Sequence, residues 1–379
     1  MLIKKTYINI SLLFISLLVI IILLEVIIRF FSNEAGIFSK PDKVLGSVLI
    51  PGARYRQSAE GFSQGKINSK GLRDVEHDYT KSPKAYRILI IGDSFTEALQ
   101  VALDSTYFRR LSRLFNGNQL NASYEIVAMG RSGMGTLEEM LWYINEGRKY
   151  HPDLVLCAFY IGNDFRDNSY ELTTGMRGRV FKPFLTQNGR IDTSFVATNS
   201  FRIHSAMIPF LRLSWLSTFI LRKIKLIRVN KQLNIHKEVD FSDDLSIFKK
   251  NYTEPWRQAV QTTRRILTMF NAEVQKDNAR FIVVGIPDSY QIYGAIPYYQ
   301  YHSMPIDLDI NKPDSLLEGM AAISGFSYFS LFQCFREAFE CNNIYCYGFG
   351  KMLGTGHWNE RGHALAAQCL KSVLQRYLP

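Results

Sequence analysis

Residues 87–97 read Arg-Ile-Leu-Ile-Ile-Gly-Asp-Ser-Phe-Thr-Glu, a short apolar run that stops at a glycine. Such a run, rich in β-branched residues, predicts a buried parallel strand that ends in a tight turn. Functional groups of open α/β sheets collect just beyond the carboxyl ends of the strands, which is where Ser94 falls. A serine there is either a nucleophile, if a histidine and oxyanion donors lie near it, or part of an ordinary turn. The tripeptide Gly-Asp-Ser alone favours an ordinary turn, so the role of Ser94 has to be inferred from the rest of the chain.

Apolar runs alternate with helical patterns along most of the chain. We expect further strands at 124–129, 154–161, 280–286 and 326–329, and helices at 104–116, 136–150, 244–277, 315–323 and 360–377. This alternation indicates an α/β fold, a three-layer α/β/α sandwich with a mainly parallel sheet. We expect one domain at 87–379 with a helical insertion at about 165–245, preceded by a linker and lead-in at 32–86.

Residues 1–31 differ from the rest of the chain. Lys4 and Lys5 precede an uncharged, apolar stretch at 6–24, and apolar residues continue beyond it. The length is that of a helix that crosses a bilayer, and no small-residue cleavage site follows. The pattern favours a signal anchor over a cleaved signal peptide, and the two lysines favour a cytoplasmic N-terminus. We therefore expect a single-pass membrane protein whose domain is periplasmic or extracellular.

The composition indicates a globular protein with an uneven positive charge. The chain has 379 residues, of which 47% are hydrophobic and 21% charged, and its net charge is +11. No acidic residue lies between Asp192 and Glu238, where lysines and arginines recur among apolar residues at helical spacing. This spacing predicts a basic amphipathic helix at about 210–235, which either lies on an anionic membrane or packs on its own domain. Nucleic acid is not an expected partner of a chain that faces outward from a membrane.

Three of the five cysteines, Cys334, Cys341 and Cys346, lie close together in the sequence. Their spacing is not a zinc pattern, and no histidine lies nearby before His357. In an oxidising compartment two of the three can pair, and otherwise they are buried or free thiols.

Polar or glycine residues follow three of the expected strands. Ser94 follows the first, Gly133 lies in the glycine-rich loop after the second, and Asn163 follows the third. Because parallel strands end at the same edge of a sheet, these residues are expected on one rim. His357 lies in a loop before the last helix and can point back across that rim, with Asn359 as the helix N-cap.

These four blocks, in this order, resemble the SGNH hydrolases, the GDSL-type esterase/lipase superfamily, in its membrane-anchored bacterial form. The resemblance covers residues 87 to about 375 and implies an SGNH, flavodoxin-like α/β fold. It implies that Ser94 is the nucleophile and that His357 is the general base and then the general acid. The backbone N–H groups of Ser94 and Gly133 and the Asn163 amide would form the oxyanion hole. By the same resemblance, no metal and no cofactor are needed.

One departure from the family pattern concerns the residue that orients the histidine. The family usually has an aspartate two or three residues before it, where this chain has Thr355 and Gly354. Three outcomes stay open. Ser94 and His357 can work as a dyad with a backbone carbonyl or Thr355 orienting the ring, an acid such as Glu360 or Asp288 can reach in, or hydrolysis can be lost.

The sequence therefore predicts a membrane-anchored serine esterase that hydrolyses, or transfers, an acyl group such as acetyl on an envelope carbohydrate or lipid. The partners expected are this ester and the membrane, the latter through residues 6–31 and also through the basic helix. A second hypothesis is a weak or inactive binding or scaffold protein of envelope-polysaccharide modification that keeps the fold. A third is a lipase that docks on the bilayer with the basic helix.

Overall fold

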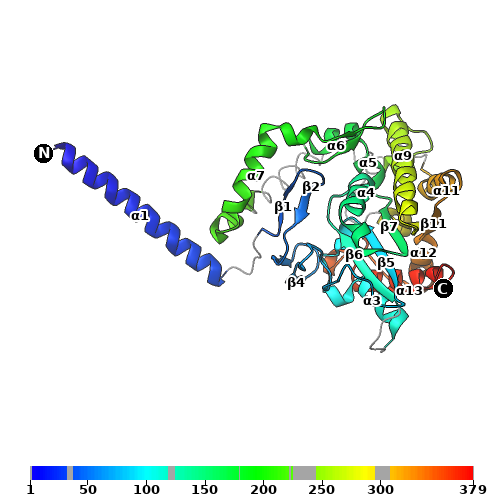
Figure 1. Cartoon of the computed structure of the whole chain (residues 1–379). Coiled ribbons are helices and arrows are strands. Elements are labelled where there is room, and N and C mark those ends of the chain that lie inside the picture. The colour runs from blue at the N-terminus through cyan, green and yellow to red at the C-terminus, as the bar shows by residue number, and fades with distance from the viewer. Residues whose placement is uncertain are drawn as a thin grey trace.

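The computed structural model describes residues 2–31, 37–117, 124–178, 180–221, 223–224, 245–294 and 308–378. At its centre lies a five-stranded sheet in the order β11-β10-β7-β5-β6, in which every neighbouring pair is parallel (Figure 1). The strands are β5 Tyr86–Gly92, β6 Tyr124–Gly130, β7 Leu154–Tyr160, β10 Arg280–Ile286 and β11 Ser327–Ser330. The expected α/β fold with a parallel sheet is therefore confirmed, with each strand at or within one residue of its predicted position.

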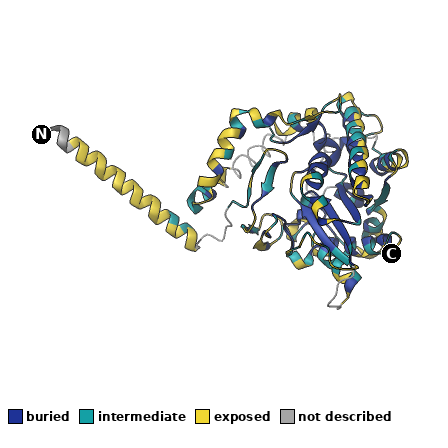
Figure 2. Ribbon diagram, in the orientation of Figure 1, coloured by how far each residue is buried: buried dark blue, intermediate teal, exposed yellow. Residues whose placement is uncertain are grey.

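Side chains alternate between the two faces of the sheet, and each face has its own apolar core. On β5, Leu89 and Ile91 belong to one core, whereas Ile88 and Ile90 belong to the other. The first core is closed by α4 Thr136–Asn145, α9 Glu254–Lys276 and α11 Lys312–Ser324, and the second by α3 Tyr107–Asn116, α12 Phe332–Asn342 and α13 Glu360–Leu374. Figure 2 shows the buried strands in dark blue between these helices. The chain thus forms the three expected layers.

The helices differ from expectation at several ends. The helix predicted at 244–277 begins ten residues later, because Pro255 occupies its first turn and Thr253 is its N-cap. Residues 246–248 form a separate 3₁₀ turn. The helix predicted at 104–116 begins only at Tyr107, after the 3₁₀ turn Leu103–Ser105, and the helix predicted at 136–150 ends at Asn145, before the 3₁₀ turn Gly147–Tyr150. Sequence periodicity did not predict α10 Ser289–Tyr293 or α12.

The segment expected as linker and lead-in contains two antiparallel pairs of short strands. β1 Ser39–Asp42 pairs with β2 Gly46–Leu49, and β3 Arg54–Gln57 pairs with β4 Ser63–Lys66. Ser63 donates a hydrogen bond to the carbonyl of Leu99 at 2.5 Å. The buried guanidinium of Arg73 donates to the carbonyls of Glu97 and Val101, at 2.8 and 2.6 Å. These contacts fix the segment against the chain that follows β5.

The first helix, α1 Leu2–Phe31, is exposed along almost its whole length (Figure 2). Its segment Thr6–Phe30 is long and apolar enough to cross a membrane. The insertion begins with α6 Tyr170–Arg177 and two short strands, β8 Phe184–Leu185 and β9 Ile191–Asp192. The chain is then helical at 199–211, which is α7, and again at 215–221. The helix predicted at 210–235 is therefore broken at 212–214, and residues 225–244 lie outside the described part of the chain.

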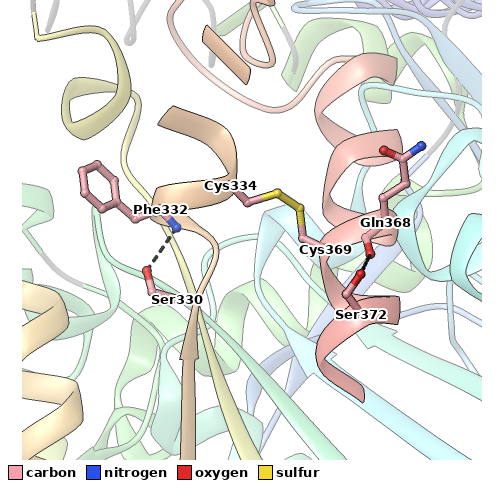
Figure 3. The surroundings of a disulfide bond; sticks show 6 residues. All are labelled: Ser330, Phe332, Cys334, Gln368, Cys369 and Ser372. Atoms are coloured by element: carbon pink, nitrogen blue, oxygen red, sulfur yellow. Dashed lines mark hydrogen bonds between the residues drawn. A yellow bond between two sulfur atoms is a disulfide. The ribbon is translucent and has the colours of Figure 1, made fainter. Parts of the chain in front are cut away.

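A disulfide joins two helices of the second core. It links Cys334 of α12 to Cys369 of α13 (Figure 3). Cys341 is free and exposed, and Cys346 is free and buried. Of the two alternatives left open for the trio Cys334, Cys341 and Cys346, free thiols hold for Cys341 and Cys346. Cys334 instead pairs outside the trio, with a cysteine 35 residues away on the last helix, which the packing of the two helices brings near.

Candidate active site

Ser94 lies where β5 ends and the one-turn helix α2 Ser94–Glu97 begins. A side chain at Gly92 would place a Cβ 2.4 Å from the hydroxyl oxygen of Thr96, so the strand can turn into α2 only with glycine there. Asp93 caps α2, since its Oδ1 accepts from the N–H of Phe95 at 2.9 Å. Its Oδ2 lies 3.3 Å from the Ser94 hydroxyl. Asp93 is thus a buried turn residue that fixes the backbone around Ser94.

His357 reaches Ser94 from the loop before α13. The distance between His357 Nε2 and Ser94 Oγ is 2.9 Å. Trp358, the next residue, is buried, and Asn359 accepts from the N–H groups of Arg361 and Gly362 at 3.0 and 3.2 Å. The predicted N-cap is confirmed. Anchored by this cap and this buried ring, the loop presents the imidazole to the serine.

The other ring nitrogen of His357 is bound by Glu60, a residue of the turn between β3 and β4. Nδ1 of His357 lies 2.7 Å from Glu60 Oε2, and the backbone N–H of His357 donates to the same oxygen at 3.2 Å. Gly356 has a φ of +75°, and a Cβ there would lie 3.1 Å from Glu60 Oε1. Glycine thus suits both the backbone conformation and the close approach of the carboxylate. A continuous line of hydrogen bonds runs from Glu60 through His357 to Ser94.

Among the described residues, none of the three predicted ring-orienting groups forms a hydrogen bond with His357. The Thr355 hydroxyl donates to the carbonyl of Met352 at 3.0 Å. Asp288 accepts from the Tyr160 hydroxyl at 2.7 Å and from the N–H of Tyr290 at 2.8 Å. Glu360 is exposed in the first turn of α13. The carboxylate at the ring comes instead from 297 residues earlier in the chain.

Sequence reasoning missed Glu60 because nothing local marks it. It lies in the polar stretch Ser58-Ala-Glu-Gly-Phe-Ser63, between two four-residue strands without a clear apolar alternation. The only weak signal is Gly61, whose added Cβ would lie 2.2 Å from the carbonyl oxygen of Gln100 and 2.6 Å from the ring of Phe349. That contact depends on the tertiary fold and could not be inferred from spacing.

The strand ends that carry Gly133 and Asn163 flank the strand end that carries Ser94. Gly92 of β5 lies opposite Gly130 of β6 and Ala158 of β7. A Cβ on Gly130 would lie 2.1 Å from the backbone nitrogen of Glu97, so the end of β6 touches α2 directly. The loop after it is tied down by Ser132, whose N–H donates to Glu97 Oε2 at 2.7 Å.

Gly133 and Asn163 each have a feature that suits the rim. Gly133 is exposed and has a φ of +79°, a conformation that favours glycine. Asn163 is half-buried, and its side-chain Oδ1 is buried without a hydrogen-bond partner in the described part of the chain. The predicted juxtaposition of three strand ends is thus present, with β5 between β6 and β7.

The charges at the site support one another. Burial alone would raise the pKa of Glu60, but the hydrogen bonds and the charge of His357 hold that pKa below its usual value. Burial opposes the charged form of His357, yet the hydrogen bond and the charge of Glu60 raise the pKa of His357 above the ordinary 6.5. The His357 side chain is 27% exposed and that of Glu60 is 40% exposed, so solvent reaches the pair.

His363, six residues later, has the opposite environment. Its side chain is fully buried, its Nδ1 accepts from the N–H of Tyr107 at 3.3 Å, and burial lowers its pKa to about 3. It is a neutral packing residue of α13, away from the hydroxyl of Ser94. Among the described residues, no group of three or more His, Cys, Asp or Glu side chains is arranged to hold a metal ion.

This arrangement can activate a hydroxyl. An ionised carboxylate only accepts hydrogen bonds, so the bond to Glu60 puts the ring proton on Nδ1 and leaves Nε2 free to accept the Ser94 proton. Acceptance of that proton makes an imidazolium, which the Glu60 charge stabilises.

No protein-family model matches the sequence, and no curated protein matches it. Solved structures do match. An acetyl xylan esterase has 14% identity and a TM-score of 0.42, over 76% of this chain and 99% of that chain. A catalytic mutant of an acetylxylan esterase from Geobacillus stearothermophilus has 12% identity and a TM-score of 0.42, over 78% of this chain and 95% of that chain. A structure described as a GDSL-like lipase from Parabacteroides merdae has 11% identity and a TM-score of 0.43, over 77% of this chain and 96% of that chain. These three matches cover 76 to 78% of this chain.

Proposed function

We propose that this protein is a serine ester hydrolase whose nucleophile is Ser94, whose general base is His357 and whose orienting acid is Glu60. The observation that carries the proposal is the unbroken pair of short contacts, 2.7 Å from Glu60 Oε2 to His357 Nδ1 and 2.9 Å from His357 Nε2 to Ser94 Oγ. Both distances are within the range of good hydrogen bonds, so no rearrangement is needed before proton transfer.

In the proposed reaction, Ser94 Oγ attacks the carbonyl carbon of an ester while His357 Nε2 takes the hydroxyl proton. The tetrahedral oxyanion is held by the backbone N–H groups of Ser94 and Gly133 and by the Asn163 amide. Collapse of this intermediate breaks the bond to the alcohol, which leaves with the proton from His357. Water, activated in turn by His357, then hydrolyses the acyl-serine; a sugar hydroxyl in place of water would give acyl transfer.

The proposed setting is the outer side of a membrane. Thr6–Phe30 would span the bilayer, and Lys4 and Lys5 would keep the N-terminus inside. The Cys334–Cys369 disulfide supports an oxidising compartment for the domain, because such bonds persist mainly in secreted or exported proteins.

The proposed substrate class is an acyl ester, such as an acetyl ester, on an envelope carbohydrate or lipid. The partial exposure of His357 and Glu60 supports a group carried on a large molecule, since the catalytic groups meet solvent rather than a closed cavity. A cavity of about 520 Å³ lies instead within the insertion, between Tyr170, Phe181 and Phe195.

The alternative of an inactive scaffold rested on the missing acid before His357. The contact between Glu60 and Nδ1 of His357 supports an active site over this alternative. The lipase hypothesis uses the same chemistry and differs in its substrate and in its docking on the bilayer through the basic helix.

Reaction with a fluorophosphonate probe tests the proposal without knowledge of the natural ester. The full chain, in detergent or in nanodiscs, is expected to be labelled on the peptide that contains Ser94. Ser94→Ala is expected to abolish labelling, whereas Ser315→Ala, at an exposed position of α11, is expected to leave it unchanged. A folded wild-type protein that takes no label would contradict the esterase and favour a binding role.

A further inference from the structure

The insertion carries an apolar face that the described part of the domain does not cover. On α7, Ile203, Met207 and Phe210 are spaced by four and three residues, so they share one side of the helix. Phe210 is 74% exposed, and Leu213, just beyond the helix end, is 70% exposed. Phe201 and Ile208, on other sides of α7, are buried. The helix is thus docked on the domain by one side and leaves a second, strongly apolar side free.

The same character continues after α7. In the helical residues at 215–221 and at 223–224, Ile220, Leu221 and Ile224 are exposed. Exposed basic side chains flank the face, namely Arg202, Arg212 and Lys223. No acidic residue occurs in the sequence between Asp192 and Glu238. Apolar and basic groups together, without acidic ones, are typical of helices that lie in the interface of an anionic membrane.

The joint between these helices is bound by the end of α1. The carboxylate of Glu25 accepts from the Ser214 hydroxyl at 2.8 Å and from the backbone N–H groups of Trp215 and Leu216 at 2.9 and 3.0 Å. It therefore caps the helical segment that begins at Trp215, as an N-cap carboxylate would. The capping residue comes from a helix 190 residues earlier in the chain.

Arg29 completes this contact. Its Nε donates to Glu25 Oε1 at 2.8 Å, and its Nη2 donates to the carbonyl of Leu213 at 3.1 Å. Figure 1 shows the C-terminal end of α1 beside the end of α7. The two charged residues of the segment Thr6–Phe30, Glu25 and Arg29, thus both bind the joint at 211–216.

The position of Glu25 along α1 sets the height of the joint. A helix rises about 1.5 Å per residue, so Glu25 lies about 28 Å from Thr6, where the apolar segment begins. The hydrocarbon core of a bilayer is about 30 Å thick. If α1 spans it from the inside, Glu25 and the joint reach its outer edge, which is the depth at which an interfacial helix lies.

We propose that α7 and the described residues 212–221 and 223–224 form a membrane-docking element, whose apolar face sits in the outer interface of the same bilayer that α1 crosses. The face consists of Ile203, Met207, Phe210, Leu213 and Ile220. Arg202, Arg212 and Lys223 would meet anionic headgroups. The proposal rests on the proposed spanning of the membrane by α1, and it does not depend on ester hydrolysis.

Two observations select the bilayer over a protein partner as the occupant. The face runs through the joint at 211–216, which is bonded directly to the end of α1, so the face is continuous with the lipid-facing surface proposed for α1. Its charged residues are all basic, which matches anionic headgroups. The element would hold the domain at a fixed height above the membrane.

Depth-dependent quenching of a fluorophore tests this docking. The full chain carries Cys341→Ser, which removes the exposed free thiol, and one new cysteine labelled with NBD: Leu18→Cys in α1, Phe210→Cys on the face, or Ile323→Cys on α11. Ile323 is a matched control, because it is 73% exposed and also apolar. Nanodiscs with anionic lipid contain no quencher, a doxyl group near the headgroup, which reaches the depth of Phe210, or a doxyl group deep in the acyl chain, which reaches the depth of Leu18, and iodide serves as the aqueous quencher.

The labels are expected to separate. Leu18 should lose emission with the deep doxyl lipid and Phe210 with the headgroup doxyl lipid, and both should resist iodide, whereas Ile323 should respond to iodide only. Loss of emission from the label at Leu18, without loss of emission from the label at Phe210, would overturn the docking and leave the proposed anchor intact. Absence of loss at Leu18 would show that the proposed anchor itself is wrong. Protection of Phe210 from both quenchers would mean that protein covers the face, and would also overturn the docking.

The Glu25 contact is tested by Glu25→Leu in the Phe210→Cys chain. Leucine keeps α1 apolar but cannot accept hydrogen bonds from Ser214, Trp215 and Leu216. We expect smaller doxyl quenching at Phe210 and unchanged quenching at Leu18 in the corresponding chain. Equal quenching at Phe210 with and without Glu25 would show that the contact does not set the position of the helix.

Discussion

The parallel sheet and the segment at 37–85 contribute to the candidate site in different ways. The sheet places the ends of β5, β6 and β7 side by side, and the loop before α13 brings His357 to Ser94. All of these positions lie next to recognisable strand or helix boundaries. The segment contributes one side chain, Glu60, from a turn between two short polar strands. Regular structure can be inferred from local patterns, whereas a side chain delivered by tertiary docking cannot. Our predictions test whether the site needs both regions.

The largest effect is expected at the sheet side of the site. His357→Ala removes the group that accepts the Ser94 proton, and loss of this base in a serine hydrolase lowers kcat by about 10⁶-fold. The measurement is kcat for a small soluble ester such as 4-nitrophenyl acetate. His363→Asn is the control, since His363 does not contact Ser94, and the folded variant is expected to keep its activity. Similar losses for both histidines would contradict the assignment.

Glu60→Gln is expected to have the next largest effect, a loss of up to about 10⁴-fold in kcat. The amide keeps the shape but can leave the wrong tautomer of His357 and no longer stabilises the imidazolium. Glu360→Gln, an exposed acid three residues after His357, should leave kcat unchanged. Equal activities of Glu60→Gln and wild type would reduce the site to the sheet residues alone.

Asn163→Ala tests the rim beside Ser94. Loss of one oxyanion donor typically lowers kcat by about 100- to 1000-fold, with little change in KM. The loss should appear with soluble esters and be accompanied by weaker binding of a tetrahedral boronate inhibitor. An unchanged kcat would remove Asn163 from the proposed oxyanion hole and leave it as a turn residue at the end of β7.

The smallest loss of activity is expected from a change at Gly61, which tests how the segment at 37–85 packs against the rest of the domain. A Cβ at Gly61 would meet the carbonyl of Gln100 and the ring of Phe349, so Gly61→Ala should push the Glu60 turn away from His357. A displacement of about 1 Å near a catalytic group can cost about 100-fold in rate. We expect a loss of about 10- to 100-fold. Gly319→Ala on α11, where a Cβ meets nothing within 4 Å, is the matched control and should be neutral.

Much of the fold could be predicted because the sheet is regular. The β10 bounds agree with the apolar run at 280–286, and β7 ends one residue before its predicted end, since each strand is a continuous buried run closed by a turn. The start of the helix predicted at 244–277 is wrong by ten residues, because the helical pattern extends to residues before Pro255, whereas the proline occupies the first turn of the actual helix. The Cys334–Cys369 pair was missed because its two helices meet only in the tertiary fold.

The site could be predicted in part for the same reason. Ser94 and His357 follow a strand and precede a helix, and the structure brings them within 2.9 Å. The acid could not be predicted, since candidates near His357 in the sequence, such as Glu360, point to solvent and Asp288 is held by Tyr160. A family pattern gives the place of an acid relative to the histidine, but the ring needs only a carboxylate at Nδ1, from whichever segment reaches it.

The most direct test of the account is the pH dependence of fluorophosphonate inactivation for wild type and Glu60→Gln. His357 must be neutral to accept the Ser94 proton, so the rate falls as pH drops through its pKa. Glu60 raises the pKa of His357 in the folded protein, and loss of its charge should therefore move the acid limb to lower pH while lowering the plateau rate. A Glu60→Gln profile with that displacement supports the relay from Glu60 to Ser94. An acid limb at the wild-type pH, or at higher pH, would contradict it.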